Sequence, residues 1–197
     1  MHTSPLAILA ATALAATVTP AGIRAQVPAG APAAQASAPA VTQALLRDIG
    51  GVERKLVGLG EAIPEDKYGW KPGEGVRSVS EVLQHVAADN YFIPTIGGVA
   101  APAATGIKNG DYPSVQAYET RKATKAEALQ ALRESFAHLR TAMGGTDQAF
   151  LDRSMNVFGS QMTGLDLWVL TATHLHEHLG QLIAYARSNN VVPPWSR

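Results

Sequence analysis

The chain of 197 residues contains no cysteine. That absence excludes disulfides, thiolate metal ligands, a cysteine nucleophile and a lipidated cysteine. Any metal ion must therefore be bound through histidine, aspartate, glutamate or backbone oxygen. A chain without thiols is also compatible with an oxidising compartment, because it has no free thiol to protect there.

Charge is scarce and balanced. Charged residues make up 16% of the chain, against roughly 25% in an average soluble protein. Lys+Arg and Asp+Glu both number 16, so the formal net charge is zero. This balance argues against a nucleic-acid partner held by bulk electrostatics. The sequence also lacks the Walker, G-x-G-x-x-G and G-x-S-x-G motifs, so neither nucleotide binding nor serine-hydrolase chemistry is indicated.

The N-terminal segment is typical of an export signal. Residues 6–18 are almost wholly apolar, which suits a signal-peptide core and is too short to span a bilayer. The sequence therefore predicts a signal peptide over residues 1–25, a Pro/Ala-rich linker over residues 26–40 and a folded domain over residues 41–197. We expect a periplasmic or secreted protein with no membrane association after signal removal. A misassigned start codon or a loosely attached N-terminal helix is the alternative.

Hydrophobic periodicity predicts four helices in the folded part, and no segment shows the alternation of a β-strand. The expected helices cover about residues 41–63, 78–94, 124–143 and 163–188. Three of them begin with a capping box, in which a hydroxyl and a carboxylate satisfy the first backbone N–H groups. These boxes are Ser78–Glu81, Thr124–Glu127 and Thr163–Asp166.

The connections between these helices differ in length. Gly50-Gly51 is expected to interrupt the first helix, and Pro94 is expected to disrupt the second. Residues 97–121 predict a long connection that carries a short helix over residues 114–120. The sequence therefore predicts an all-α fold: a four-helix bundle with a long crossover between helices 2 and 3.

The histidines carry the chemical signal. His174 and His178 lie four residues apart on the fourth helix, so both rings point to the same side. They share a mostly apolar stripe that faces inward, and His85 has a similar setting on the second helix. Three histidines leave a fourth position open on a metal ion, which is the catalytic pattern for zinc. The alternative is a polar core network in which these histidines bind protein groups and no metal.

Two polar residues follow these histidines at helical spacing. Asp89 lies four residues after His85 and is the candidate to orient an imidazole, act as a base for bound water or supply a fourth ligand. A solvated carboxylate near a helix end is the alternative. Gln181 lies three residues after His178 and is expected to form a hydrogen bond near the site.

Other polar residues are predicted to lie outside the site. His176 is turned roughly 200° from His174 and is expected to be exposed, and His138 is expected to pack or to face solvent. Glu177 is not a predicted protease base, because the sequence around it is not H-E-x-x-H. The basic residues before and within the start of the third helix are interpreted as a solvated helix end; they are Arg121, Lys122 and Lys125.

Two stretches carry a family resemblance. The stretch from His174 to Tyr185 reads H-L-H-E-H-L-G-Q-L-I-A-Y and is followed by Val192-Pro193-Pro194. A second stretch joins Trp70-Lys71-Pro72 to the residues from Arg77 to Ala87. They resemble the fourth-helix H-x-x-x-H-x-G-Q-L motif, and the W-x-P turn with its following helix, of the DinB/YfiT-like family. The resemblance covers about residues 41–194.

The resemblance implies a four-helix bundle with a long crossover between helices 2 and 3. It places a three-histidine metal site at His85, His174 and His178, with zinc or nickel as the cofactor. Members of the family often dimerise, so it also implies a homodimer. Some members transfer thiols such as bacillithiol or mycothiol, which raises a thiol S-transferase as an alternative.

Export favours a reaction that needs only water over one that needs a cytosolic thiol. The sequence therefore predicts a divalent-metal-dependent, hydrolase-type enzyme that acts on a small molecule, with Asp89 as the candidate catalytic residue. A metal-binding or stress-associated protein without catalysis fits the same residues. We expect nitrogens of His85, His174 and His178 to lie within about 3–4 Å of one another, as ligands of one ion at roughly 2.1 Å must.

Overall fold

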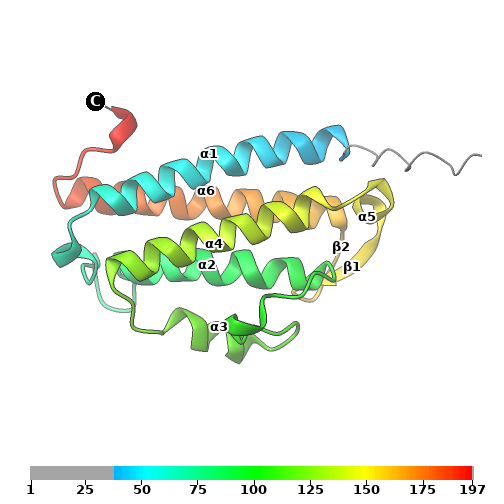
Figure 1. The fold of residues 1–197 in the computed structure, drawn as a ribbon, viewed down its shortest axis with the longest axis horizontal. Coiled ribbons are helices and arrows are strands. Elements are labelled where there is room, and N and C mark those ends of the chain that lie inside the picture. The colour runs from blue at the N-terminus through cyan, green and yellow to red at the C-terminus, as the bar shows by residue number, and fades with distance from the viewer. Residues whose placement is uncertain (1–37, 197) are drawn as a thin grey trace, which may run out of the picture. The chain divides into compact units, whose positions relative to one another are not determined.

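The computed structural model describes residues 38–196, so the predicted signal peptide and most of the predicted linker lie outside the described residues. Four long helices form the body of the domain: α1 (Ala40–Ala62), α2 (Val79–Ile96), α4 (Lys125–Gly144) and α6 (Gly164–Ser188) (Figure 1). The shorter elements are α3 (Tyr112–Glu119), α5 (Gln148–Asp152), β1 (Ser154–Val157) and β2 (Ser160–Thr163). The predicted all-α bundle is confirmed. No helix within the described range is long and apolar enough to cross a membrane.

The order of the helices explains the long crossover. Helices α1 and α2 each pack against both α4 and α6, so α1 and α2 lie at opposite corners of the bundle. Figure 1 shows α2 and α4 running in one direction and α1 and α6 in the other. Because α2 and α4 are parallel neighbours, the chain must return along the bundle between them. Residues 97–124, which include α3, make this return.

Two predicted helix breaks are wrong. Helix α1 runs without interruption through Gly50-Gly51, and α2 continues past Pro94 to Ile96. Each glycine costs about 1 kcal/mol relative to alanine, but full burial of a leucine or isoleucine contributes about 1.5–3 kcal/mol. The stripe around Ile49 and Leu56 is fully buried, so packing holds α1 together. Pro94 sits in the last turn of α2, where few helical hydrogen bonds remain to be lost.

The start of α4 is tied to the end of α1. The Nζ atom of Lys125 donates hydrogen bonds to the carbonyl oxygens of Glu61 and Ile63, both at 2.7 Å. These carbonyls lie at the C-terminal end of α1, where helices leave acceptors unpaired and favour a cation. The interpretation of Lys125 as part of a solvated helix end is therefore wrong.

A short β-hairpin precedes α6, where the sequence predicted no strand. Strands β1 and β2 pair antiparallel, with Ser154 opposite Thr163 and Val157 opposite Ser160. Each strand has only four residues, so alternation gives little signal. The turn places Phe158 and Gly159 at φ angles of 51° and 87°. Asn-Gly is the usual signal for such a turn, and a bulky residue at positive φ conceals it.

The capping box of α6 gives a first testable prediction. The Thr163 hydroxyl accepts from the Asp166 N–H at 3.1 Å, and the Asp166 carboxylate accepts from the Thr163 N–H at 2.8 Å. We expect Thr163→Ala to lower the free energy of unfolding by about 1 kcal/mol, measured by urea denaturation. Thr173→Ala is the control, because the Thr173 hydroxyl donates only to carbonyls of its own helix and should matter little. Equal losses in both variants would contradict the capping role.

Candidate metal centre

Three histidines come together where α2 packs against α6. One nitrogen from each of His85, His174 and His178 lies within 4.8 Å of the other two. The ring centroids are between 4.4 and 5.2 Å apart. Ligands of one tetrahedral ion lie roughly 3.4 Å apart, so the three nitrogens are grouped closely enough to share an ion, and the expected spacing of 3–4 Å stays a prediction.

His85 is oriented by a carboxylate from the crossover. The ring is buried, and its Nδ1 atom donates to Oε1 of Glu119 on α3 at 2.7 Å. The Nη2 atom of Arg77 holds the other carboxylate oxygen at 3.2 Å. Burial raises the pKa of Glu119. The hydrogen bond from His85, the charge of His85 and the Arg77 guanidinium lower it by more than burial raises it, so the pKa of Glu119 is below its usual range. Because Nδ1 faces the Glu119 carboxylate, Nε2 is the nitrogen of His85 that is left for a ligand role.

His178 is oriented by a chain of three hydrogen bonds. Its Nδ1 donates to Oε1 of Gln181 at 2.8 Å, and Nε2 of Gln181 donates to the Tyr185 hydroxyl at 2.8 Å. That hydroxyl donates to the Arg77 carbonyl at 3.0 Å. Burial lowers the pKa of His178 to about 4, so the ring is neutral at pH 7. The sequence-based expectation of a Gln181 hydrogen bond near the site is met.

The Nε2 atom of His178 is the unexplained atom of the group. It is buried and has no hydrogen-bond partner among residues 38–196. A buried polar atom without a partner costs free energy, so it indicates a ligand. A polar network within the protein accounts for His85 and His174 but leaves this nitrogen unsatisfied. The atom therefore fits metal coordination better than a purely structural role.

Asp89 lies among the histidine nitrogens. Its Oδ2 atom accepts from Nε2 of His174 at 2.8 Å and lies 3.3 Å from Nε2 of His85. The hydrogen bond to Asp89 raises the pKa of His174, against the opposing effect of burial. The Asp89 side chain is only 15% exposed, so the alternative of a solvated carboxylate is wrong. The three imidazoles, with this carboxylate beside them, suit a divalent transition metal.

The remaining histidines lie outside this group. His176 is exposed, as expected, and pairs with Asp48 of α1 at 2.9 Å. His138 is half-buried against Tyr91, with ring centroids 5.4 Å apart. The Glu177 side chain is 76% exposed and lies 3.7 Å from Nδ1 of His174, at the rim of the group.

Comparisons with known proteins agree with this fold. A family model described as "DinB superfamily" matches residues 49–182. The chain resembles a DinB-like protein from Bacillus subtilis (19% identity, TM-score 0.58, covering 76% of this chain and 94% of that one). It also resembles a DinB-like protein from Bacillus cereus (12%, 0.62, 77% and 95%) and a protein assigned to the DinB family from Exiguobacterium sibiricum (19%, 0.57, 76% and 92%). A search of curated proteins gives no match.

Proposed function

This chain belongs to the DinB superfamily, and from that premise we propose that it is a divalent-metal-dependent enzyme of the hydrolase type. The ligands are His85, His174 and His178, and the ion is zinc or nickel. One observation carries the proposal: the buried, unpartnered Nε2 of His178 lies in a cluster with two further imidazoles and the Asp89 carboxylate. Three protein ligands leave a coordination position for water or substrate.

Residues around the three histidines would have separate roles in such a site. When bound, the ion would polarise a substrate oxygen and make water more acidic. Glu119 accepts a hydrogen bond from Nδ1 of His85, and Gln181 accepts one from Nδ1 of His178. These bonds leave the Nε2 lone pair of each ring available to a metal ion. Nε2 of His174, which now donates to Asp89, must pass its proton to solvent or to Nδ1 before it can bind a cation. The Asp89 carboxylate is then free to accept a proton from an attacking water.

Hydrolysis is favoured over thiol transfer by the expected location. We further propose that the mature protein begins near Gln26 in the periplasm or outside the cell, where cytosolic thiols are scarce and a reaction that needs only water is favoured. The substrate is then a small molecule with an ester, amide or phosphoryl bond. N-terminal sequencing of protein recovered from the cell envelope tests the location, and a mature chain that begins at Met1 would contradict it.

Metal analysis coupled to activity tests the function. The purified protein is supplied with zinc or nickel, desalted and examined by elemental analysis, and we expect about one ion per chain. The loaded protein is then assayed on chromogenic ester, amide and phosphate probes, with free metal in buffer as the blank. Activity should disappear with a chelator and return with the ion. A loaded but inactive protein would support metal binding without catalysis, and no bound ion would overturn the proposal.

The outer partner Glu119 gives a second prediction. Glu119→Gln keeps an oxygen that can accept from His85 but removes the charge, and we expect metal affinity to fall by about 10–100-fold. Competition with a fluorescent chelator measures this change. Asp48→Asn is the matched control, because Asp48 also pairs with a histidine, His176, but lies outside the cluster. Equal affinities for the wild type and Glu119→Gln would show that His85 needs no such partner.

A further inference from the structure

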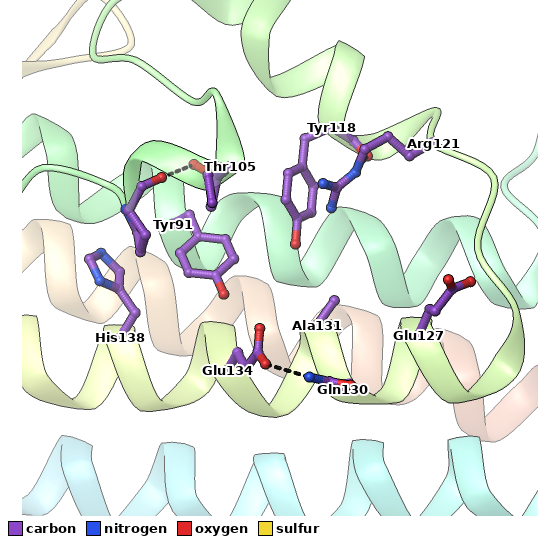
Figure 2. Close-up of a pocket in the computed structure, with 11 residues that line it drawn as sticks. Tyr91, Thr105, Tyr118, Arg121, Glu127, Gln130, Ala131, Glu134 and His138 are labelled. Atoms are coloured by element: carbon purple, nitrogen blue, oxygen red, sulfur yellow. Dashed lines mark hydrogen bonds between the residues drawn. The ribbon is translucent and has the colours of Figure 1, made fainter.

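A second concave site lies between the crossover and α4, apart from the metal centre. The groove has a volume of about 400 Å³, within the range of small-molecule sites. Its lining includes Tyr91, Tyr118, Arg121, His138 and two carboxylates, Glu127 and Glu134 (Figure 2). None of these residues belongs to the histidine cluster, and the proposed hydrolase gives none of their side chains a role.

The groove and the metal centre lie on opposite faces of α2. Tyr91 follows Asp89 by two residues, which turns it roughly 200° around the helix. The neighbouring residues Tyr118 and Glu119 on α3 also face different sites: Tyr118 lines the groove, and Glu119 contacts His85. A ligand in the groove would therefore not reach the three histidines.

Arg121 supplies a fixed cation. Its guanidinium carbon lies 3.4 Å from the centre of the Tyr118 ring, and its Nε donates to the Tyr118 carbonyl at 3.2 Å. Arg121 is exposed and forms no ion pair with an acidic side chain in the described part of the chain, as is also true of Arg47, Arg54, Arg153 and Arg187. A guanidinium held flat without an acidic partner is preorganised to receive a carboxylate.

The rest of the groove suits an aromatic body. The Tyr91 ring lies 5.8 Å from the Tyr118 ring and 5.4 Å from His138, centroid to centroid. Burial lowers the pKa of His138, so its ring is neutral at pH 7, and its buried Nε2 has no partner among the described residues. Figure 2 shows the Tyr91 hydroxyl and the Glu134 carboxylate pointing into the same part of the groove.

We propose that this groove binds a small aromatic carboxylate. The ligand carboxylate pairs with Arg121, and its ring packs among Tyr91, Tyr118 and His138. A donor group on the ligand, an amine or a hydroxyl, is directed to Glu134, whose carboxylate also accepts from Gln130 at 2.8 Å. This binding does not depend on the metal centre.

Three probes on the full chain test the site by titration calorimetry: benzoate, benzamide and 4-aminobenzoate. Benzoate should bind at least about 10-fold more tightly than benzamide, the neutral analogue of similar shape, because benzamide cannot form the charge-assisted pair with Arg121. Arg121→Gln should abolish this preference, and Arg121→Lys should keep part of it, because lysine retains the charge without the planar fork. Arg47→Gln, an exposed arginine on α1, is the control and should behave as the wild type.

The amine tests the other end of the groove. 4-Aminobenzoate should bind more tightly than benzoate, and Glu134→Gln should reduce this difference. The titrations are repeated on His174→Ala protein, in which benzoate affinity should be unchanged. Equal affinities of benzoate and benzamide, or a benzoate affinity that survives Arg121→Gln, would overturn the proposal. Binding that is lost in His174→Ala would place the ligand at the metal centre instead, with the same consequence.

Discussion

His174→Ala and His178→Ala should each lower bound zinc or nickel from about one ion per chain to background. Loss of an outer partner costs roughly 10–100-fold in metal affinity, so loss of a ligand should cost at least about 100-fold. In either variant only two imidazoles remain near the ion. Elemental analysis after metal loading and desalting measures the effect directly, and chelator competition gives the affinity.

The same helix offers a matched control for this experiment. His176 lies two residues from both ligands but is exposed and pairs with Asp48, so His176→Ala should retain the ion. A second group of potential ligands, His85 with Asp89 and Glu119, also lies within 4.8 Å. An ion retained by both His174→Ala and His178→Ala would point to that group and contradict the assignment made above.

The parts of the site that sequence reasoning found share one property: helical spacing. His174 and His178 are i and i+4 on α6, and Asp89 is i+4 from His85 on α2. Such spacing fixes which side chains share a face before anything is known of the neighbouring helix. The capping boxes worked for the same reason, since they are local hydrogen-bond patterns, and α2, α4 and α6 each begin directly after the expected cap.

The parts that sequence reasoning missed depend on tertiary contacts. Glu119 lies 34 residues after His85, in the crossover, and nothing in its neighbourhood marks it as a histidine partner. Arg77 contacts the hydrogen-bond partners of two histidines: its side chain donates to Glu119, the partner of His85, and its carbonyl accepts from Tyr185, which is linked through Gln181 to His178. No spacing rule pairs residues across a connection of this length. The expected short helix over residues 114–120 was nonetheless close to the observed α3.

The contacts of Arg77 suggest why the crossover matters to the metal centre. The segment before α2 and the end of α3 meet at this arginine, whose side chain holds the hydrogen-bond partner of His85. The pair is part-buried, with the Arg77 side chain 40% exposed and the Glu119 side chain 12% exposed. Its effect is to hold Glu119 in one position, which fixes the tautomer of His85.

The largest effect on stability should come from Trp168, on the buried side of α6. Its side chain is fully buried, and its ring stacks on Phe150 of α5 with centroids 5.6 Å apart. We expect Trp168→Ala to lower the free energy of unfolding by about 3–5 kcal/mol, because it removes a large buried ring and leaves a cavity. Urea denaturation of the metal-free protein measures this loss without a contribution from bound metal.

Two further tryptophan variants separate ring packing from hydrogen bonding. The Nε1 atom of Trp168 is buried without a hydrogen-bond partner among residues 38–196. Trp168→Phe removes this unsatisfied donor and keeps an aromatic ring, so we expect it to cost much less than Trp168→Ala. Trp195→Ala is the control, because Trp195 is 42% exposed and should change stability by no more than about 0.5 kcal/mol. Similar losses for Trp168→Phe and Trp168→Ala would contradict this expectation and would mean that the site requires the full shape of the indole.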